Sequence, residues 1–246
     1  MSQDETTSTE RTSTVERDPR AVTVNTLLAE LHATRVATWP AADLQVNIDQ
    51  RKLLTDKADR RAFVQAGDVL DPIRLPEVDG GVVDLDELLQ DGPVVLLFFR
   101  FAGCPACNVA LPHYRDALHP GLVELGATLV GVSPQVPQDL RYIKVRHDLP
   151  FPVASDTDDA LARALGIAYV PDEASQRYAR SKGADIGRIT GTDRWELPMP
   201  AAIVVDRDRV VRFADVSPDW MVRTEAAIVL EAVAAIDTAP PVHGAR

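Results

Sequence analysis

The residues with the clearest chemistry in this 246-residue sequence are two cysteines, three positions apart. They stand in the quartet Cys104-Pro105-Ala106-Cys107, and the sequence has no other cysteine. If Cys104 occupies the N-cap of a helix and Pro105 its first turn, free backbone N–H groups and the helix dipole stabilise a thiolate at neutral pH. Cys107 then lies within disulfide reach of Cys104. We therefore expect the two cysteines to be a redox-active, catalytic pair.

Two other interpretations of the pair fit the sequence less well. A zinc site needs more ligands, and His113 and His119 follow, but only five residues separate Cys107 from His113, against about twelve in the usual finger. Two inert core cysteines would meet at a strand-to-helix junction only by coincidence. We expect no metal and no organic cofactor.

The quartet comes directly after a predicted strand and directly before a predicted helix. The runs Val94–Phe99, Thr128–Val132 and Ala201–Val205 are continuously apolar and rich in β-formers, as expected of strands buried on both faces of a sheet. Helical segments are expected between these strands, near residues 107–125, 138–147 and 158–165. Strands that alternate with helices predict an α/β protein with a central mixed sheet flanked by helices.

Polar turns predict two hairpins, and an apolar helix is expected to close the domain. The predicted hairpins pair residues 73–75 with 81–83 and residues 201–205 with 210–213. The closing helix is expected between Met221 and Ile236. The polar stretch from Pro171 to Trp195 has no clear period, so we interpret it as an inserted excursion.

Several segments of this predicted domain match one known family. They are Gly92–Arg100, Cys104–Asn108, Gly131–Gln135, Phe151–Asp156, Trp195–Ala201 and Val205–Asp208. Together they resemble the peroxiredoxin-like branch of the thioredoxin superfamily, of the alkyl hydroperoxide reductase and thiol-specific antioxidant type. The resemblance spans roughly Gly67 to Ile236. It implies a thioredoxin-like fold that reduces a peroxide or exchanges disulfides.

The resemblance also suggests supporting residues around the pair. It implies that Pro200 takes the position of a cis-proline that faces the two cysteines. The arginine that typical members hold on a neighbouring strand is replaced around Pro200, and the buried acid of thioredoxins is absent from Val94–Phe99. Arg100 is the cation nearest in sequence and could stabilise a thiolate. Trp195 could line a substrate groove.

The order in which the two sulfur atoms react stays open at this point. By the family match, Cys107 holds the position of the peroxide-attacking cysteine, and Cys104 stands where relatives carry threonine. The capping argument favours Cys104 as the exposed nucleophile instead.

The function we expect is that of a thiol-dependent peroxidase working through a Cys-x-x-Cys dithiol/disulfide cycle. Its partners would be a peroxide or disulfide substrate and an external dithiol reductant, either thioredoxin-like or a low-molecular-weight thiol. A homodimer is possible. The alternatives are a thiol–disulfide oxidoreductase acting on protein or small-molecule disulfides, and a non-enzymatic redox sensor.

Composition excludes several other classes of function. The 26 Lys and Arg against 37 Asp and Glu give a net charge of −11, which disfavours binding to nucleic acid or to an anionic membrane. The longest strongly apolar run, Val94–Phe99, is far shorter than the roughly 20 residues of a membrane span. The N-terminus lacks the features of a signal peptide, so we expect a cytoplasmic protein.

The remaining N-terminal sequence predicts helices outside the resemblance. Val24, Leu27, Leu28 and Leu31 share one helical face, and Trp39-Pro40 ends that pattern. Residues 42–64 favour a second helix or a pair of helices. The expected organisation is a disordered tail at 1–20, a helical extension at 21–66, a thioredoxin-like domain at 67–238 and a C-terminal tail at 239–246.

Overall fold

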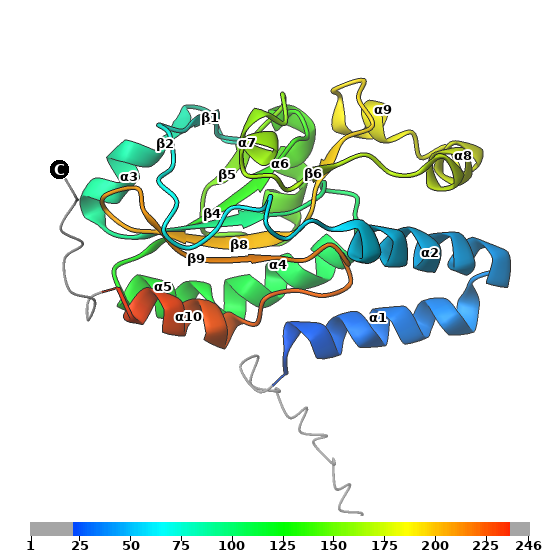
Figure 1. Ribbon diagram of the computed structural model, residues 1–246, viewed down its shortest axis with the longest axis horizontal. Coiled ribbons are helices and arrows are strands. Elements are labelled where there is room, and N and C mark those ends of the chain that lie inside the picture. Colours follow the sequence, from blue (N-terminus) through cyan, green and yellow to red (C-terminus); the bar gives the residue numbers. More distant parts are fainter. Residues whose placement is uncertain (1–21, 237–246) are drawn as a thin grey trace, which may run out of the picture.

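The computed structural model of the chain describes residues 22–236 (Figure 1). The tails predicted at 1–20 and 239–246 therefore lie outside the described residues. Within residues 22–236, no helix is long and apolar enough to cross a membrane.

A mixed sheet forms the centre of the described protein, as predicted. Its five strands lie in the order β5-β4-β3-β8-β9. β3 pairs in parallel with β4 and antiparallel with β8, so parallel and antiparallel halves meet at β3. All residues of β3 and β8 are buried because helices cover both faces of the sheet. The strand bounds are Val94–Phe98 for β3, Thr128–Ser133 for β4, Val153–Ser155 for β5, Ala201–Val205 for β8 and Val211–Val216 for β9.

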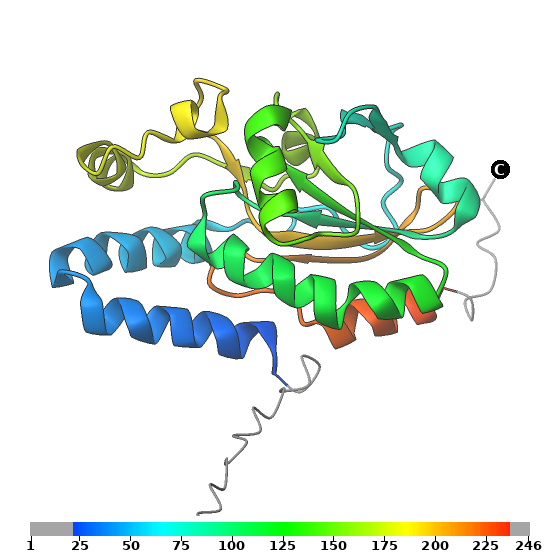
Figure 2. The same cartoon turned by 180° about the vertical axis from the view of Figure 1, so that it is seen from behind.

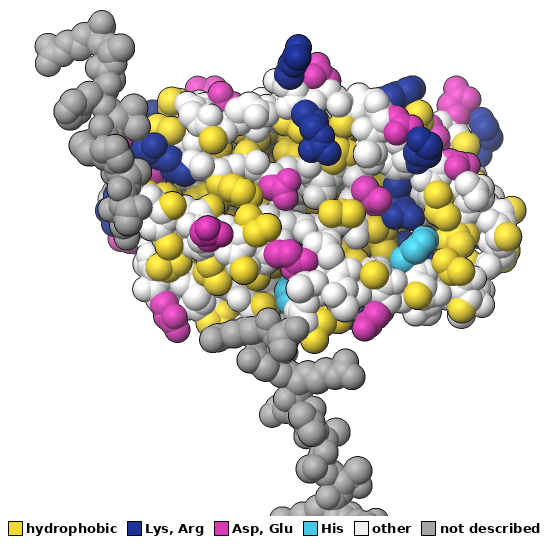
Figure 3. All heavy atoms as spheres, turned by 60° about the horizontal axis from the view of Figure 1, so that its bottom comes forward, with side chains coloured by type: hydrophobic (Ala, Val, Ile, Leu, Met, Phe, Trp, Pro, Cys, Tyr) yellow, Lys and Arg dark blue, Asp and Glu magenta, His cyan; other side chains and the backbone are white. Residues whose placement is uncertain are grey.

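Helices form one layer on each side of this sheet. One layer contains α4, α5 and α10, and the opposite layer contains α6 and α7 (Figures 1 and 2). On the side of the molecule that carries α4, α5 and α10, acidic side chains are scattered among hydrophobic ones rather than gathered in one patch (Figure 3). The helix bounds are Pro105–Ala117 for α4, His119–Glu124 for α5, Pro137–Arg146 for α6, Ala160–Ala164 for α7 and Ala226–Ala234 for α10.

Two of the predicted helices differ from those in the structure. The segment near 107–125 is two helices, α4 and α5, which meet at Leu118. Pro120 lies in the first turn of α5, where a missing N–H costs no helical hydrogen bond. The closing helix α10 begins at Ala226 rather than near Met221. The residues just before it are held by contacts with the N-terminal helices, described below.

The first predicted hairpin is present at the edge of the domain. β1 (Arg74–Pro76) and β2 (Val82–Asp84) pair antiparallel around the predicted turn. Asp84 then caps α3 (Leu85–Asp91) by accepting hydrogen bonds from the backbone N–H groups of the first turn.

The stretch from Pro171 to Trp195, interpreted as an inserted excursion, contains two helices that the sequence did not predict. They are α8 (Glu173–Ser181) and α9 (Ile186–Thr190). Asp172 and Asp185 cap them, each accepting a hydrogen bond from a backbone N–H three residues on. The short strands β6 (Ala168–Tyr169) and β7 (Leu197–Pro198) pair across the base of this insertion.

The predicted N-terminal helices are present as α1 (Val24–Thr38) and α2 (Ala41–Lys57). α1 packs along α4, and α2 packs along α8 (Figure 1). α2 ends at Lys57, well before residue 64. Val64 is buried against the core, and its backbone N–H donates to Leu165 O at 2.9 Å. The extension thus contacts both the main domain and the insertion.

A hydrogen-bond cluster fastens the start of α1 to the loop before α10. The backbone N–H groups of Val24 and Asn25 donate to the carboxylate of Glu225. The Asn25 side chain accepts from Arg223 N at 2.9 Å and donates to Arg223 O at 2.8 Å. The position of Arg223 therefore depends on the N-terminal extension.

A buried carboxyl group links the insertion to the loop before α7. Asp159 is fully buried, its Oδ2 lies 3.4 Å from Arg194 Nη2, and its Oδ1 has no hydrogen-bond partner. Burial raises the pKa of Asp159 to about 6, and the charges of Glu196 and Asp156 add to this effect. Ionised Asp159 is therefore costly to the folded state.

We expect Asp159→Asn to weaken the pH dependence of stability. Because the folded-state pKa lies above the ordinary value of 3.8, the protonated carboxyl stabilises the fold at low pH, and this contribution is lost as pH rises through about 6. Between about pH 4.5 and pH 7.5 the variant should lose about 2 kcal/mol less unfolding free energy than the wild type. Urea unfolding at both pH values measures this. Asp158→Asn, an exposed neighbour, should behave as the wild type, and equal pH dependence in all three proteins would contradict the assignment.

Candidate active site

The cysteine pair lies at the junction between β3 and α4, as predicted. Cys104 is the N-cap, with an extended backbone at φ −71° and ψ 117°, and Pro105 opens the helix. Both cysteines are free thiols, each only 1% exposed. The expectation that Cys104 would be exposed was wrong, because side chains of α1, α2 and the loop at Trp220 surround it.

The two thiols are electrostatically unequal. The pKa of Cys104 lies well below its ordinary value, chiefly because the Cys107 thiol donates a hydrogen bond to it. The charges of Arg100 and Arg223 and the backbone N–H of Cys107 lower it further, against the effect of burial. Burial raises the pKa of Cys107, and its hydrogen bond to Cys104 raises it again. Cys104 is therefore the sulfur stabilised as a thiolate, and Cys107 keeps its proton.

Arg100 lies beside this thiolate. Its Nη1 is 4.0 Å from Cys104 Sγ, and its guanidinium lies 4.4 Å from the ring centroid of Trp220. The aromatic face holds the guanidinium in place while its charge acts on the sulfur. The structure thus brings this predicted supporting residue next to the pair.

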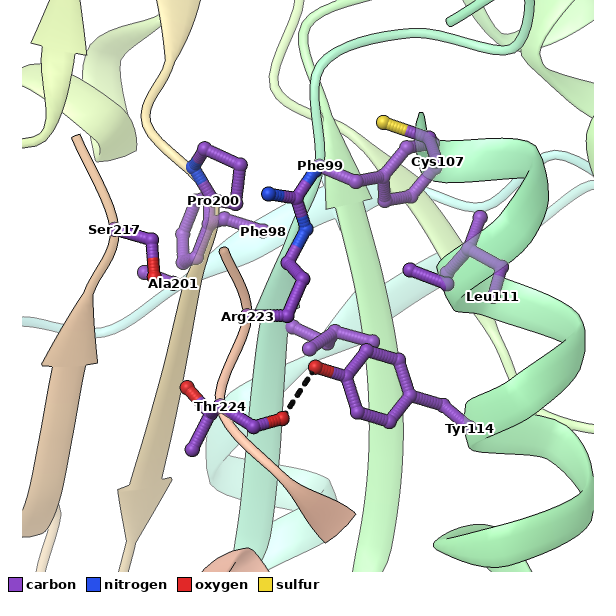
Figure 4. A pocket seen from close by; sticks show the side chains of 12 residues that line it. Phe98, Phe99, Cys107, Leu111, Tyr114, Pro200, Ala201, Ser217, Arg223 and Thr224 are labelled. Carbon is purple, nitrogen blue, oxygen red and sulfur yellow. Dashed lines mark hydrogen bonds between the residues drawn. The ribbon is translucent and has the colours of Figure 1, made fainter. Parts of the chain in front are cut away.

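Arg223 is a second cation at the site, and it was not identified from the sequence. It belongs to the loop after β9, and Figure 4 shows its guanidinium pointing into a cavity that Cys107 and Pro200 also line. Nη1 donates to the carbonyls of Trp220 and Val222, whereas Nη2 is buried without a hydrogen-bond partner. No local sequence pattern marks this residue, because only the fold brings it to α4.

The loop that carries Arg223 is fixed against α4. Tyr114 is fully buried, and its hydroxyl donates to Thr224 O at 2.6 Å (Figure 4). Together with the contacts from Asn25, this bond places the guanidinium from two sides. The Arg223 charge is thereby positioned before any substrate binds.

The space beside Cys107, here called the Cys107 cavity, is small. It is lined by Cys107, Pro200, Arg223, Ser217 and apolar side chains of β3 and α4, and its volume is about 10 Å³. That is room for roughly one water molecule.

The expectation that Pro200 would follow a cis peptide bond was wrong. Residues 22–236 contain no cis peptide bond. The trans form is the lower in energy for most X-Pro bonds. Pro200 directly precedes β8, and its carbonyl accepts from Ser217 N at 2.8 Å. Pro200 still lines the Cys107 cavity.

A larger pocket lies on the Cys104 side of the pair. We call it the tryptophan pocket, because Trp39, Trp195 and Trp220, the chain's three tryptophans, all line it. Its volume is about 260 Å³, and Cys104 and Arg100 also line it. The structure thus divides the predicted site residues into two groups. Arg100, Cys104 and Trp195 line the tryptophan pocket, and Cys107 and Pro200 line the Cys107 cavity.

Gln135 holds the loop before the pair in place. Its side chain accepts from Ala102 N at 2.8 Å and donates to Ile189 O of α9 at 2.9 Å. It is buried, and it also connects the site to the insertion. The sequence match around Gly131–Gln135 contained this residue, but the sequence did not show its role.

Possible metal ligands are dispersed. Within residues 22–236, no three His, Cys, Asp or Glu side chains are grouped so that they could hold a metal ion. His113 packs edge-on against Tyr114, and His119 packs against Phe151.

Known proteins share this fold and this region of sequence. The AhpC/TSA family model matches residues 66–214. A putative peroxiredoxin of Mycobacterium tuberculosis is 33% identical over 105 residues, which is 42% of this chain and 67% of that protein. Peroxiredoxin Bcp of Escherichia coli is 29% identical over 104 residues, 42% of this chain and 65% of that protein. The chain thus spans about two thirds of the length of these relatives.

Solved structures agree with the sequence relatives. The crystal structure of peroxidoxin BcpB from Mycobacterium tuberculosis has a TM-score of 0.55 and 25% identity, covering 70% of this chain and 98% of that one. PrxQ of Xylella fastidiosa, at 16% identity, has a TM-score of 0.55 over 71% of this chain and 98% of that one, which supports the fold.

With the family model covering more than half of its residues, the chain belongs to the AhpC/TSA family. Within the thioredoxin superfamily it is peroxiredoxin-like, and it is an oxidoreductase of the thiol-dependent class. The helices α1 and α2 lie outside the matched residues.

We expect Arg100→Gln to raise the pKa of Cys104, because it removes a positive charge beside the thiolate. The pH dependence of the thiolate's ultraviolet absorbance, or of its alkylation rate, measures this. Arg74→Gln removes the same charge from an exposed position on β1 and should leave the titration unchanged. An Arg100 variant that titrates like the wild type would show that its charge does not act on the sulfur.

Proposed function

We propose that the protein is a thiol-dependent peroxidase that cycles between the Cys104–Cys107 dithiol and the corresponding disulfide. The observation that carries this proposal is the paired state of the two sulfur atoms. Cys104 is the N-cap of α4 with Arg100 Nη1 4.0 Å from its sulfur, and Cys107 follows in the first turn of the same helix. In this arrangement the pKa of Cys104 is lowered and that of Cys107 is raised. Family membership supports peroxide as the substrate.

Cys104 is the attacking sulfur in this proposal. It carries the lowered pKa, it lies next to Arg100, and it lines the larger of the two spaces. Cys107 reaches only a cavity that fits about one water molecule. The helix-capping argument and the structure therefore favour the same cysteine, against the order that the family match alone implies.

The reaction starts when the Cys104 thiolate attacks one peroxide oxygen. A sulfur–oxygen bond forms, the oxygen–oxygen bond breaks, and the leaving oxygen departs with the electron pair and takes up a proton. Arg100 and Arg223 stabilise the negative charge near the sulfur during this step. Cys104 becomes a sulfenic acid.

Cys107 completes the oxidative half of the cycle. Its sulfur displaces hydroxide from Cys104, so that a disulfide forms and water leaves. An external dithiol, or two molecules of a small thiol, then returns both cysteines to thiols and becomes a disulfide itself. A compartment with a reduced thiol pool supplies such a reductant, which agrees with the cytoplasmic location expected from the sequence. The possible homodimer stays a prediction.

Mixing the reduced protein with substoichiometric hydrogen peroxide tests the peroxidase chemistry. Thiol loss should be at least about tenfold faster than for free cysteine at pH 7, since only a few per cent of free cysteine is thiolate there. Thiol loss no faster than for free cysteine would contradict the peroxidase and favour disulfide exchange or sensing.

Two matched variants test the order of attack. Cys107→Ser should still react with peroxide and accumulate a sulfenic acid at Cys104, which dimedone traps, because the second sulfur is absent. Cys104→Ser should lose the fast reaction, because burial, the largest cause of the raised pKa of Cys107, is still present. A trapped sulfenic acid in Cys104→Ser, with none in Cys107→Ser, would assign the attack to Cys107 and its cavity.

A further inference from the structure

The tryptophan pocket combines aromatic walls with buried positive charge. Besides the three tryptophans, Tyr169 and Tyr178 line it, although aromatic residues make up only 5% of the chain. Its walls come from α1, α2, the insertion and the loop at Trp220. Concave sites with mostly apolar walls and a few placed polar groups are typical of small-molecule binding.

Arg35 is the unusual charge in this pocket. It lies on α1, is only 5% exposed, and lines the pocket wall. Its Nη1 contacts Met221 Sδ at 3.5 Å, and its guanidinium lies 4.9 Å from the ring centroid of Trp39. Among the described residues no carboxylate forms an ion pair with it. A buried guanidinium whose partners are a thioether and an aromatic ring is poorly compensated.

Neighbouring charges act on Arg35 in both directions. Burial lowers the pKa of Arg35, the negative charge of Cys104 raises it, and the positive charges of Arg51 and Arg100 lower it. Lys182, also at the pocket, is neutralised by Asp43 at 2.9 Å, and Arg51 is neutralised by Asp219 at 3.1 Å. The single negative charge of the Cys104 thiolate acts on both Arg100 and Arg35. These two guanidinium groups therefore carry one positive charge more than the thiolate offsets, and that charge is left for a ligand.

A single negative charge on an apolar body fits these walls. A carboxylate can accept two parallel hydrogen bonds from a guanidinium, and the aromatic faces favour hydrocarbon or ring structure beside it. The ligand class is a small organic molecule with one carboxylate.

We propose that the tryptophan pocket selects organic hydroperoxides that carry a carboxylate, with Arg35 binding the carboxylate and the hydroperoxide group lying at Cys104. This inference rests on the proposed peroxidase function and names its substrate class. The Cys104 thiolate takes the outer oxygen as a sulfenic acid, and the oxygen–oxygen bond breaks. The organic alkoxide leaves, takes a proton from solvent and becomes an alcohol.

The selectivity would belong to the N-terminal extension. Arg35, Trp39 and Asn47 all precede residue 66, where the match to the family model begins. The two reacting cysteines lie inside the matched region. The residues proposed to bind the carboxylate end of the substrate lie outside it.

Binding is tested without any reaction by using the product alcohols. Para-carboxycumyl alcohol and neutral cumyl alcohol are titrated against reduced wild-type protein while tryptophan fluorescence is recorded, since all three tryptophans line the pocket. The carboxylate should bind at least about tenfold more tightly, as expected for a charge-assisted hydrogen bond. Equal affinities, or no binding of either alcohol, would overturn the inference.

Variants assign the selectivity to Arg35. Arg35→Gln should reduce the tenfold preference to near one. Arg177→Gln removes the same charge from an exposed position on α8 that does not line the pocket, and it should keep the preference. Loss of preference in both variants would indicate a general charge effect and contradict the assignment. The wild-type comparison alone can refute the inference if the Arg35 variant does not fold.

A kinetic comparison separates this inference from the proposed function. The rate constants of thiol loss are measured with para-carboxycumene hydroperoxide, cumene hydroperoxide and hydrogen peroxide. A rate ratio of about ten or more for the carboxylate over cumene hydroperoxide supports the inference. Reaction with all three peroxides at a ratio near one would overturn the selectivity and leave the peroxidase standing. No fast reaction with any of them would overturn the peroxidase and, with it, the assignment of hydroperoxides as the ligands.

Discussion

The site depends on keeping a negative sulfur stable at a buried position. Cys104 is almost completely buried, and an isolated charge there would be strongly disfavoured. Four groups offset that cost: the thiol and the backbone N–H of Cys107, and the guanidinium groups of Arg100 and Arg223. The junction of β3 and α4 supplies the first two locally, whereas the two arginines must be held by the rest of the fold.

The N-terminal extension takes part in this arrangement rather than lying beside it. Asn25 at the start of α1 bonds to the backbone of Arg223, so the extension helps to hold one cation next to Cys107. Further along α1, Arg35 contributes to the tryptophan pocket next to Cys104. One helix outside the family match thus contacts the surroundings of both sulfur atoms. This is the physical link between the extension and the chemistry of the region that matches the family model.

The insertion makes a similar contribution from the other side of the site. α8 packs on α2 and supplies Tyr178 to the pocket wall, and Gln135 ties α9 to the loop before Cys104. The insertion is polar in sequence, and little of it is buried. In α8, for example, no residue is fully buried. The apolar face of α8, which includes Tyr178 and Ala179, is short and was not recognised in the sequence, although the caps Asp172 and Asp185 were visible there.

Local sequence determined the parts of this protein that depend on local physics. Continuous apolar runs predicted β3, β4 and β8, and the order Cys104-Pro105 predicted the start of α4, because burial on both faces and helix capping act within a few residues. Only the tertiary structure decided the burial of Cys104 and the approach of Arg223 and Arg35. These features arise from contacts between segments far apart in the chain, and no spacing of neighbouring residues encodes such contacts.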